Sequence, residues 1–157
     1  MDKLKAMAIG FLFCCALVPV WCQNQSLRVD IKSAQGLVES GETFRVDTTV
    51  RNVGTTEQVF PVFTCSWFGQ WMVDNPAVFV NGHNCMQNIR FEKRLRPGQA
   101  FENSLEAHIL PDYDLRRRRE ITFRLGFDTT GYDGTRKPGA EYPAIWSNAV
   151  TIIVTSD

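Results

Sequence analysis

The residues with the clearest metal-binding chemistry lie in the segment NGHNCMQN, from Asn81 to Asn88. His83, Cys85 and Met86 are the ligand types of a soft copper site. Their order is not that of the usual copper loop, in which a cysteine comes first and other residues separate it from the histidine and the methionine. The only other histidine of the chain is His108. We therefore expect no metal and no cofactor, and we keep His83 and Met86 as the residues that a metal would use.

Cys85 has a more common use, which is a disulfide bridge. Three of the five cysteines lie within the first 22 residues, a segment that we expect to be removed on export, so only Cys65 and Cys85 remain. Two thiols in an oxidising compartment favour a bridge. The bridge would close a loop of about 20 residues and stabilise the fold by roughly 3 kcal/mol in the chain-entropy model. A bridged Cys85 would leave no thiolate for a metal ion.

Aromatic residues gather next to Cys65, in the segment from Trp67 to Met72. We expect Trp67 to pack on the bridge, as a tryptophan does in antibody domains. Trp71 is expected in a loop, where an exposed indole could stack on a sugar or anchor a protein partner. Phe68, Trp71 and Met72 are therefore candidate binding residues. Burial in the core is the interpretation that we favour for this cluster, because most tryptophans are largely buried.

A second candidate recognition loop runs from Thr129 to Tyr142. It is rich in glycine and proline and has no periodicity, which is typical of a long surface loop. Its acidic residues do not follow the spacing of a calcium-binding loop such as the EF-hand. The aromatic residues that bracket it are candidate binding residues: Tyr132, Tyr142 and Trp146.

The charged residues do not indicate a nucleic-acid partner. The run of four arginines from Arg116 to Arg119 is flanked by Asp112, Asp114 and Glu120, so the local excess is a single positive charge. After removal of the first 22 residues the chain has 16 acidic and 15 basic residues, a net charge of −1. We expect the arginine run to be a solvated loop and expect no nucleic acid to bind.

No catalytic motif is present in the sequence. There is no glycine-elbow serine motif and no glycine-rich phosphate loop, and two histidines give no convincing triad. We therefore expect a protein that is not an enzyme.

The N-terminus predicts export. Lys3 and Lys5 precede an apolar run from Ala6 to Trp21, which is typical of a secretory signal. We expect cleavage after Cys22, so that residues 23–157 form a single domain that is secreted or periplasmic. Membrane anchoring through lipidation of a cysteine is the alternative, but the residue before Cys22 is Trp21, whereas a lipobox has a small residue there.

The elements that must hold these residues are strands. The segment GETFRVDTTVRNVG alternates strictly, with Phe44, Val46, Thr48 and Val50 on one face, and ends in an Asn-x-Gly turn. Asn81-Gly82 predicts a hairpin, and residues 68–76 are expected to form a loop. In all we expect about eight strands and no helix, near residues 27–31, 41–52, 57–67, 78–80, 88–95, 101–109, 120–128 and 149–154.

The combination of GETFRVDTTVRNVG with LRPGQAF resembles the immunoglobulin-like sandwich domains of exported bacterial proteins, over roughly residues 27–109. It is also similar to the intracellular proteinase inhibitor (BsuPI-like) family, from which the chain departs by its export signal and by the insert from Trp67 to Asn88. The resemblance implies an immunoglobulin-like antiparallel β-sandwich.

Three functions follow as hypotheses. The first is an exported, non-enzymatic module that binds a macromolecule, either a protein or a glycan, through loops at one end of the sandwich. The second is a proteinase inhibitor that lays one of those loops across a protease active site. The third is a carbohydrate-binding module that uses Trp71.

Overall fold

The computed structural model describes residues 26–82, 87–110, 119–131 and 143–155. These residues form twelve strands and one short 3₁₀ helix, so the all-β prediction is confirmed. The elements are β1 (Leu27–Ser33), β2 (Leu37–Glu39), β3 (Thr43–Asn52), β4 (Gln58–Phe63), η1 (Trp67–Gln70), β5 (Trp71–Val73), β6 (Val78–Val80), β7 (Arg90–Leu95), β8 (Ala100–Ile109), β9 (Arg119–Phe123), β10 (Leu125–Asp128), β11 (Ala144–Trp146) and β12 (Val150–Thr155).

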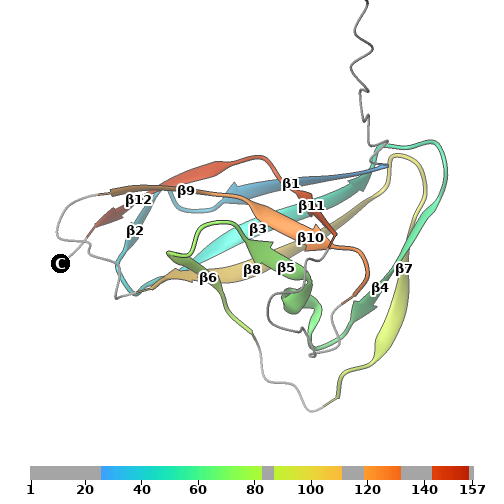
Figure 1. Ribbon diagram of the computed structural model, residues 1–157, viewed down its shortest axis with the longest axis horizontal. Helices are drawn as coiled ribbons and strands as arrows, with labels where there is room; N and C mark the ends of the chain where they lie inside the picture. Colours follow the sequence, from blue (N-terminus) through green and yellow to red (C-terminus); the bar gives the residue numbers. More distant parts are fainter. Residues whose placement is uncertain (1–25, 83–86, 111–118, 132–142, 156–157) are drawn as a thin grey trace, which may run out of the picture.

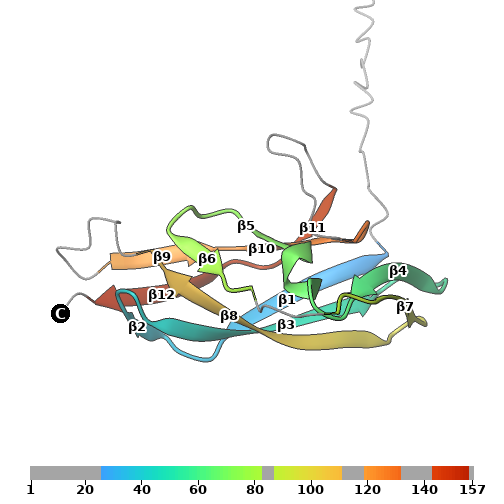
Figure 2. The same ribbon diagram turned by 90° about the horizontal axis from the view of Figure 1, so that it is seen from below.

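The strands pack as a two-layer sandwich. One layer is the four-stranded sheet β1-β3-β8-β6, and the other consists of β2-β12-β9 and β11-β10-β5. The two parts of the second layer are continuous along the chain, because β9 leads into β10 past Arg124 and β11 leads into β12. Figure 2 shows the β3 and β8 layer below the layer of β9 and β10.

The strand order is that of an immunoglobulin-type sandwich. The first layer corresponds to strands A, B, E and D of that fold, and β5, β9 with β10, and β11 with β12 correspond to C, F and G. The sequence predicted an antiparallel sandwich, but one pairing, between β2 and β12, is parallel. The strands β4 and β7 belong to neither layer and pair with each other as a separate ribbon, visible beside η1 in Figure 1.

The alternating strand β3 provides the centre of the core, as its sequence predicted. Phe44, Val46, Thr48 and Val50 are all nearly inaccessible to solvent. Phe44 meets Phe123 of the opposite layer edge to face, with ring centroids 6.0 Å apart. The inward face of this strand is therefore what joins the two layers.

Two local predictions are wrong. The residues after Asn81-Gly82 do not complete a hairpin, because β6 pairs with β8 whereas β7 pairs with β4. Residues 68–76 are not a simple loop either, since they contain most of η1 and all of β5. Strand length explains the second error: β5 has only three residues, too few for a periodic pattern to show.

Several predicted features lie outside the described residues. They are the signal segment 1–22, the possible ligands His83 and Met86, Cys85, most of the arginine run, Tyr132 and Tyr142. Within the described ranges, no helix has the length and apolar character needed to cross a membrane.

Candidate functional site

Two of the predicted binding residues, Met72 and Trp146, lie on the same face of the sheet β11-β10-β5. In the register of this sheet, Gly126 of β10 is directly opposite both Met72 of β5 and Trp146 of β11. Their neighbours Trp71 and Phe127 point into the core, so this row of three points outwards. Trp146 is 41% exposed. The fold thus brings together two residues that are 74 positions apart in sequence.

Gly126 makes room for the indole ring of Trp146. A Cβ atom at position 126 would lie 3.1 Å from the Trp146 ring carbons Cε3 and Cζ3, and 3.0 Å from the Cβ of Ala144. These are contacts tighter than those that real side chains usually make, so a larger residue would push the ring away. The glycine lets the tryptophan lie close against the sheet.

Arg124 holds the indole from the side. Its guanidinium carbon lies 5.5 Å from the centroid of the Trp146 ring, within the range of a cation–π contact. The Asp74 carboxylate fixes the arginine, because Oδ2 accepts a hydrogen bond from Arg124 Nε at 2.8 Å. Oδ1 of Asp74 also accepts from the Arg124 backbone N–H at 2.7 Å, at the point where β9 and β10 separate.

The charge of Asp74 is maintained by the same contacts. Burial alone would raise the pKa of the Asp74 carboxyl, but the backbone N–H and the guanidinium of Arg124 outweigh this effect. The pKa of Asp74 is therefore lowered from its ordinary value of 3.8, and the Asp74 carboxyl is ionised at neutral pH. We call Met72, Asp74, Arg124, Gly126 and Trp146 the Trp146 platform.

The Trp146 platform has the chemistry of recognition. Tryptophan, arginine and methionine are enriched at the centres of protein interfaces. The exposed indole is held on two sides before any partner arrives, so little side-chain freedom remains to be lost on binding. None of the five residues supplies a nucleophile with an adjacent base.

The other predicted binding residues in the described ranges lie elsewhere. Phe68 of η1 covers Gly82, where an added Cβ would meet the Phe68 ring at 2.5 Å. Phe68 and Trp71 line a groove of about 370 Å³ with Phe79 of β6. Of the two interpretations of Trp71, core burial is confirmed and an exposed binding role is not: the residue is 5% exposed and packs on Phe127, with 4.9 Å between the ring centroids. Trp67 is partly buried against the core, as expected.

The segment that follows Cys85 lies next to Cys65. Cys65 takes part in a disulfide, and its sulfur lies 2.6 Å from the carbonyl oxygen of Gln87. The backbone N–H of Cys65 donates to Oδ1 of Asn88 at 3.2 Å. Because Cys85 is outside the described residues, its pairing with Cys65 stays a prediction.

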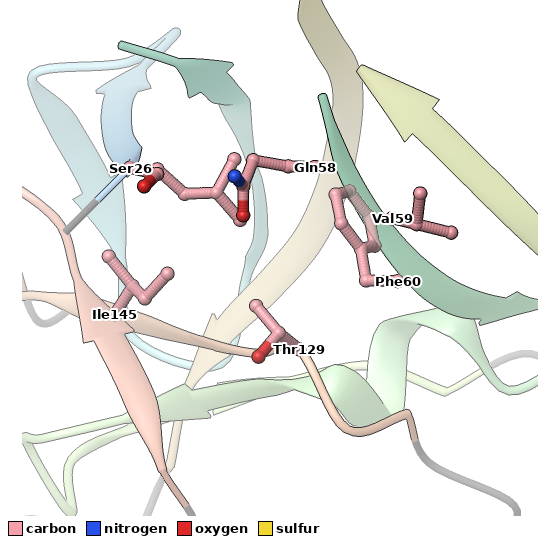
Figure 3. Close-up of a pocket in the computed structure, with 7 residues that line it drawn as sticks. Ser26, Gln58, Val59, Phe60, Thr129 and Ile145 are labelled. Carbon is pink, nitrogen blue, oxygen red and sulfur yellow. The ribbon is translucent and has the colours of Figure 1, made fainter. Parts of the chain in front are cut away.

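Figure 3 shows a pocket of about 240 Å³ where the start of β1, the strand β4 and the end of β10 meet. Ser26, Gln58 and Thr129 give it a partly polar wall, and Phe60 and Ile145 are among its apolar residues. None of the side chains that line it is ionisable, so it offers no acid or base. Across the described part of the chain, no group of three histidine, cysteine, aspartate or glutamate residues could hold a metal ion.

The sequence missed three members of the Trp146 platform: Asp74, Arg124 and Gly126. Asp74 lies within the loop that the sequence predicted at residues 68–76, and Arg124 lies within the strand that it predicted near residues 120–128. The sequence does contain a signal for this site: an arginine and a glycine in FRLGF, and a tryptophan in AIW. The signal becomes useful only once β10 and β11 are known to be neighbours in the sheet.

Comparison with known proteins gives no family. No protein-family model matches the chain, and no curated protein matches it. Among solved structures, a β-glucosidase from Listeria innocua in complex with glucose is similar over 82% of this chain, with 10% sequence identity and a TM-score of 0.35. This chain spans 16% of the β-glucosidase chain, and a likeness so distant carries no argument about function.

Proposed function

We propose that this protein is an exported, non-enzymatic domain that binds another protein through the Trp146 platform. The observation that carries the proposal is an exposed Trp146 held by Arg124, which is itself held by Asp74. The export signal supports a secreted or periplasmic location. The predicted immunoglobulin-like relationship is compatible with such a role, since these folds commonly serve as scaffolds for binding surfaces.

The binding surface in this proposal differs from the one that the sequence suggested. Trp71, one of the candidate binding residues, is in the core, and the proposed surface is instead the outer face of β11-β10-β5. The Arg124 and Asp74 charges are paired, so the platform is close to neutral. We expect a partner surface with an apolar centre and few charges opposite the indole.

The test compares the mature chain with its Trp146→Ala variant. Each is immobilised and exposed to the extracellular and envelope proteins of the source organism, and retained proteins are quantified by mass spectrometry. A partner that depends on the platform should be retained at least about tenfold less by Trp146→Ala, the loss expected for a central tryptophan. Phe79→Ala is the matched control, because Phe79 is an exposed aromatic residue of the opposite layer.

Photo-crosslinking tests whether the partner contacts the Trp146 platform. A benzophenone amino acid at position 72 should crosslink to the same partner, and the same group at position 79 should not. Equal retention by wild type and Trp146→Ala, or crosslinks only from position 79, would contradict the proposal. Capture of no protein at all would count against it too.

Glycan binding is the second candidate, and the exposed Trp146 ring favours it because sugars stack on aromatic rings. A glycan array separates the two functions: a sugar bound by wild type and lost in Trp146→Ala would make the partner a carbohydrate. Proteinase inhibition depends on the loop from Thr129 to Tyr142, most of which is outside the described residues. A panel of serine and cysteine proteases assayed with micromolar protein tests it.

A further inference from the structure

The ribbon of β4 and β7 has two long edges, and the edge along β4 is closed. Pro61 lies in the middle of β4 and has no N–H to offer a further strand. The carbonyl oxygen of Pro61 is already used, since it accepts a hydrogen bond from Gln70 Nε2 at 3.0 Å. Gly131 also lies against this edge, where an added Cβ would be 2.8 Å from the Pro61 ring.

Among the residues that the structure describes, the edge along β7 is open. The Thr64 N–H donates to the Ile89 carbonyl at 3.0 Å. This bond shows which residue pairs of the β4–β7 ladder are hydrogen-bonded and which are not. Ile89, Phe91 and Lys93 therefore direct their backbone groups towards β4, while Arg90, Glu92 and Arg94 direct theirs away from it. In the described part of the chain, no strand other than β4 pairs with β7. Figure 1 shows β7 on the outer side of the ribbon.

An aromatic pocket lies beside this open edge. It has a volume of about 280 Å³ and is lined by residues of β4, β7, β8 and η1, namely Val62, Phe63, Thr64, Trp67, Phe91, Phe101 and Asn103. Phe91 is 43% exposed, so its ring is available to a ligand. The volume is below the range of about 300–1,000 Å³ that is typical of small-molecule pockets. It suits one large apolar side chain.

The ribbon is positively charged. Its two strands carry Arg90, Lys93 and Arg94 against a single acidic residue, Glu92. Lys93 stands over the Phe101 ring that lines the pocket, with Nζ 4.8 Å from the ring centroid. Arg94 forms ion pairs with Glu92 and with Glu57. Neither Arg90 nor Lys93 has a carboxylate partner among the described residues.

We propose that the open edge of β7 binds an extended, acidic peptide segment of a partner protein as an added strand. The backbone groups of Arg90, Glu92 and Arg94 pair with the peptide backbone, which is the usual mode of strand addition. One large apolar side chain of the peptide enters the aromatic pocket beside Phe91, and the peptide carboxylates, which lie on the opposite face of the added strand, come near Arg90. This surface is separate from the Trp146 platform, and the proposal does not depend on it.

The probe is a peptide that carries these features and no more. The acetylated and amidated sequence Glu-Val-Glu-Phe-Glu-Val-Glu places its apolar side chains on one face when extended. A basic peptide with lysine in place of every glutamate is its control. We expect the acidic peptide to bind the mature chain at least tenfold more tightly than the basic one. On binding, the amides of Glu92 and Arg94 should become protected from hydrogen exchange.

Three variants separate the contributions of the β7 backbone, the Arg90 charge and the aromatic pocket to peptide binding. Glu92→Pro removes an N–H that points away from β4, so it should weaken peptide binding at least tenfold without breaking the ladder of the ribbon. Arg90→Glu reverses one exposed charge and should also weaken binding of the acidic peptide about tenfold, and it tests the proposal even where the proline variant fails to fold. Phe91→Ala removes one wall of the pocket and should lower affinity likewise. Phe79→Ala is the control that should bind as the wild type does.

Four results would overturn the proposal. The first two are that the acidic peptide does not bind, or that the acidic and basic peptides bind equally. The third is that a folded Glu92→Pro variant binds the peptide as tightly as the wild type. The fourth is that peptide binding protects amides only in other parts of the chain and none in β7. Sedimentation of the mature chain without peptide is measured alongside. A dimer that Glu92→Pro dissociates would show that a second copy of the chain, not an acidic segment, occupies the edge.

Discussion

Asparagine and aspartate side chains take the place of backbone hydrogen bonds at two places in this protein where a strand lacks a neighbour. Asn148 pairs with the edge strand β1 in this way: its Oδ1 accepts from the Ile31 N–H at 2.8 Å, and its Nδ2 donates to the Ile31 carbonyl at 3.1 Å. Asp74 does the same for the Arg124 N–H at the break between β9 and β10. Because buried or edge backbone groups are costly when unpaired, these side chains specify where the strands end.

The Asp74 carboxylate makes a pH dependence predictable at the residue scale. Its pKa in the folded protein is lowered from the ordinary value of 3.8, so its ionised form stabilises the fold. That contribution is fully present above the unfolded pKa and is lost as the pH falls through the folded pKa. We expect Asp74→Asn to be less stable than wild type at pH 6, and the difference to shrink as the pH falls below about 3.8.

Urea unfolding of both proteins at pH 6 and at pH 3 measures this difference. Asp30→Asn is a matched control, because Asp30 pairs only with the exposed Arg28 on its own strand. The control variant should track the wild type more closely at both pH values, since exposed pairs contribute little. A stability difference for Asp74→Asn that grows as the pH falls would contradict the assigned direction of the pKa shift.

At the scale of elements, one side chain joins the end of the ribbon to the end of β3. Asn52 ends β3 and is fully buried. Its Nδ2 donates to the carbonyls of Thr56 and Leu95, both at 2.8 Å, and its Oδ1 accepts from the Gly54 N–H at 2.9 Å. A single side chain therefore joins the end of β3, the turn that leads to β4 and the end of β7.

Asn52→Ala should lower the free energy of unfolding by about 1–3 kcal/mol, because the buried Leu95 carbonyl loses the bond from Asn52 Nδ2, whereas the Gly54 N–H keeps its bond to the Ser26 carbonyl. Chemical denaturation measures the loss. Asn103→Ala makes the same chemical change on β8, where the side chain has no hydrogen bond within the described residues, and should cost much less. Similar losses for the two variants would show that the bonds of Asn52 contribute little.

Element length decides how much of this fold the sequence could predict. The long strand β3 shows its alternation over ten residues, and its buried face was predicted residue by residue. The strands β2, β5 and β11 have three residues each, too few for a period to be recognised, and β6, which is equally short, was predicted because Asn81-Gly82 follows it. The segment from Glu120 to Asp128 was expected to be one strand, and its interruption at Arg124 depends on Asp74, which is 50 residues away.

The same argument applies to the candidate site. Met72 and Trp146 were predicted as binding residues by their type alone, whereas their meeting across Gly126 depends on the order of the strands in the sheet. Trp71 was named as a candidate binding residue because the residues around it show no alternating pattern that would distinguish a buried side chain from an exposed one. Local patterns identify long strands, and pairings between distant segments decide which exposed residues form a surface.

At the scale of the whole molecule, the ribbon is the part of the fold that the sandwich does not require. Its strands are inserted between β3 and β5 and between β6 and β8, and it is attached to the core through Phe60. The Phe60 ring contacts Phe127 at 5.3 Å and Phe101 at 6.3 Å between centroids. A two-stranded ribbon is marginally stable alone. The contacts of Phe60 and the hydrogen bond from the Cys65 N–H to Asn88 Oδ1 must therefore hold the ribbon in place.

The predicted bridge between Cys65 and Cys85 would act at the end of the ribbon that is opposite to Asn52. Reduction should lower the free energy of unfolding by about 3 kcal/mol, because the unfolded chain regains the freedom of a loop of about 20 residues. The loss should also be local, so that the amide of Thr64 exchanges hydrogen faster after reduction while that of Val46 in β3 does not. Thermal melting with and without reductant measures the first effect, and site-resolved exchange measures the second. An unchanged melting temperature, or two free thiols titrated in the native protein, would mean that backbone contacts such as the bond from the Thr64 N–H to Ile89 hold the ribbon without a bridge.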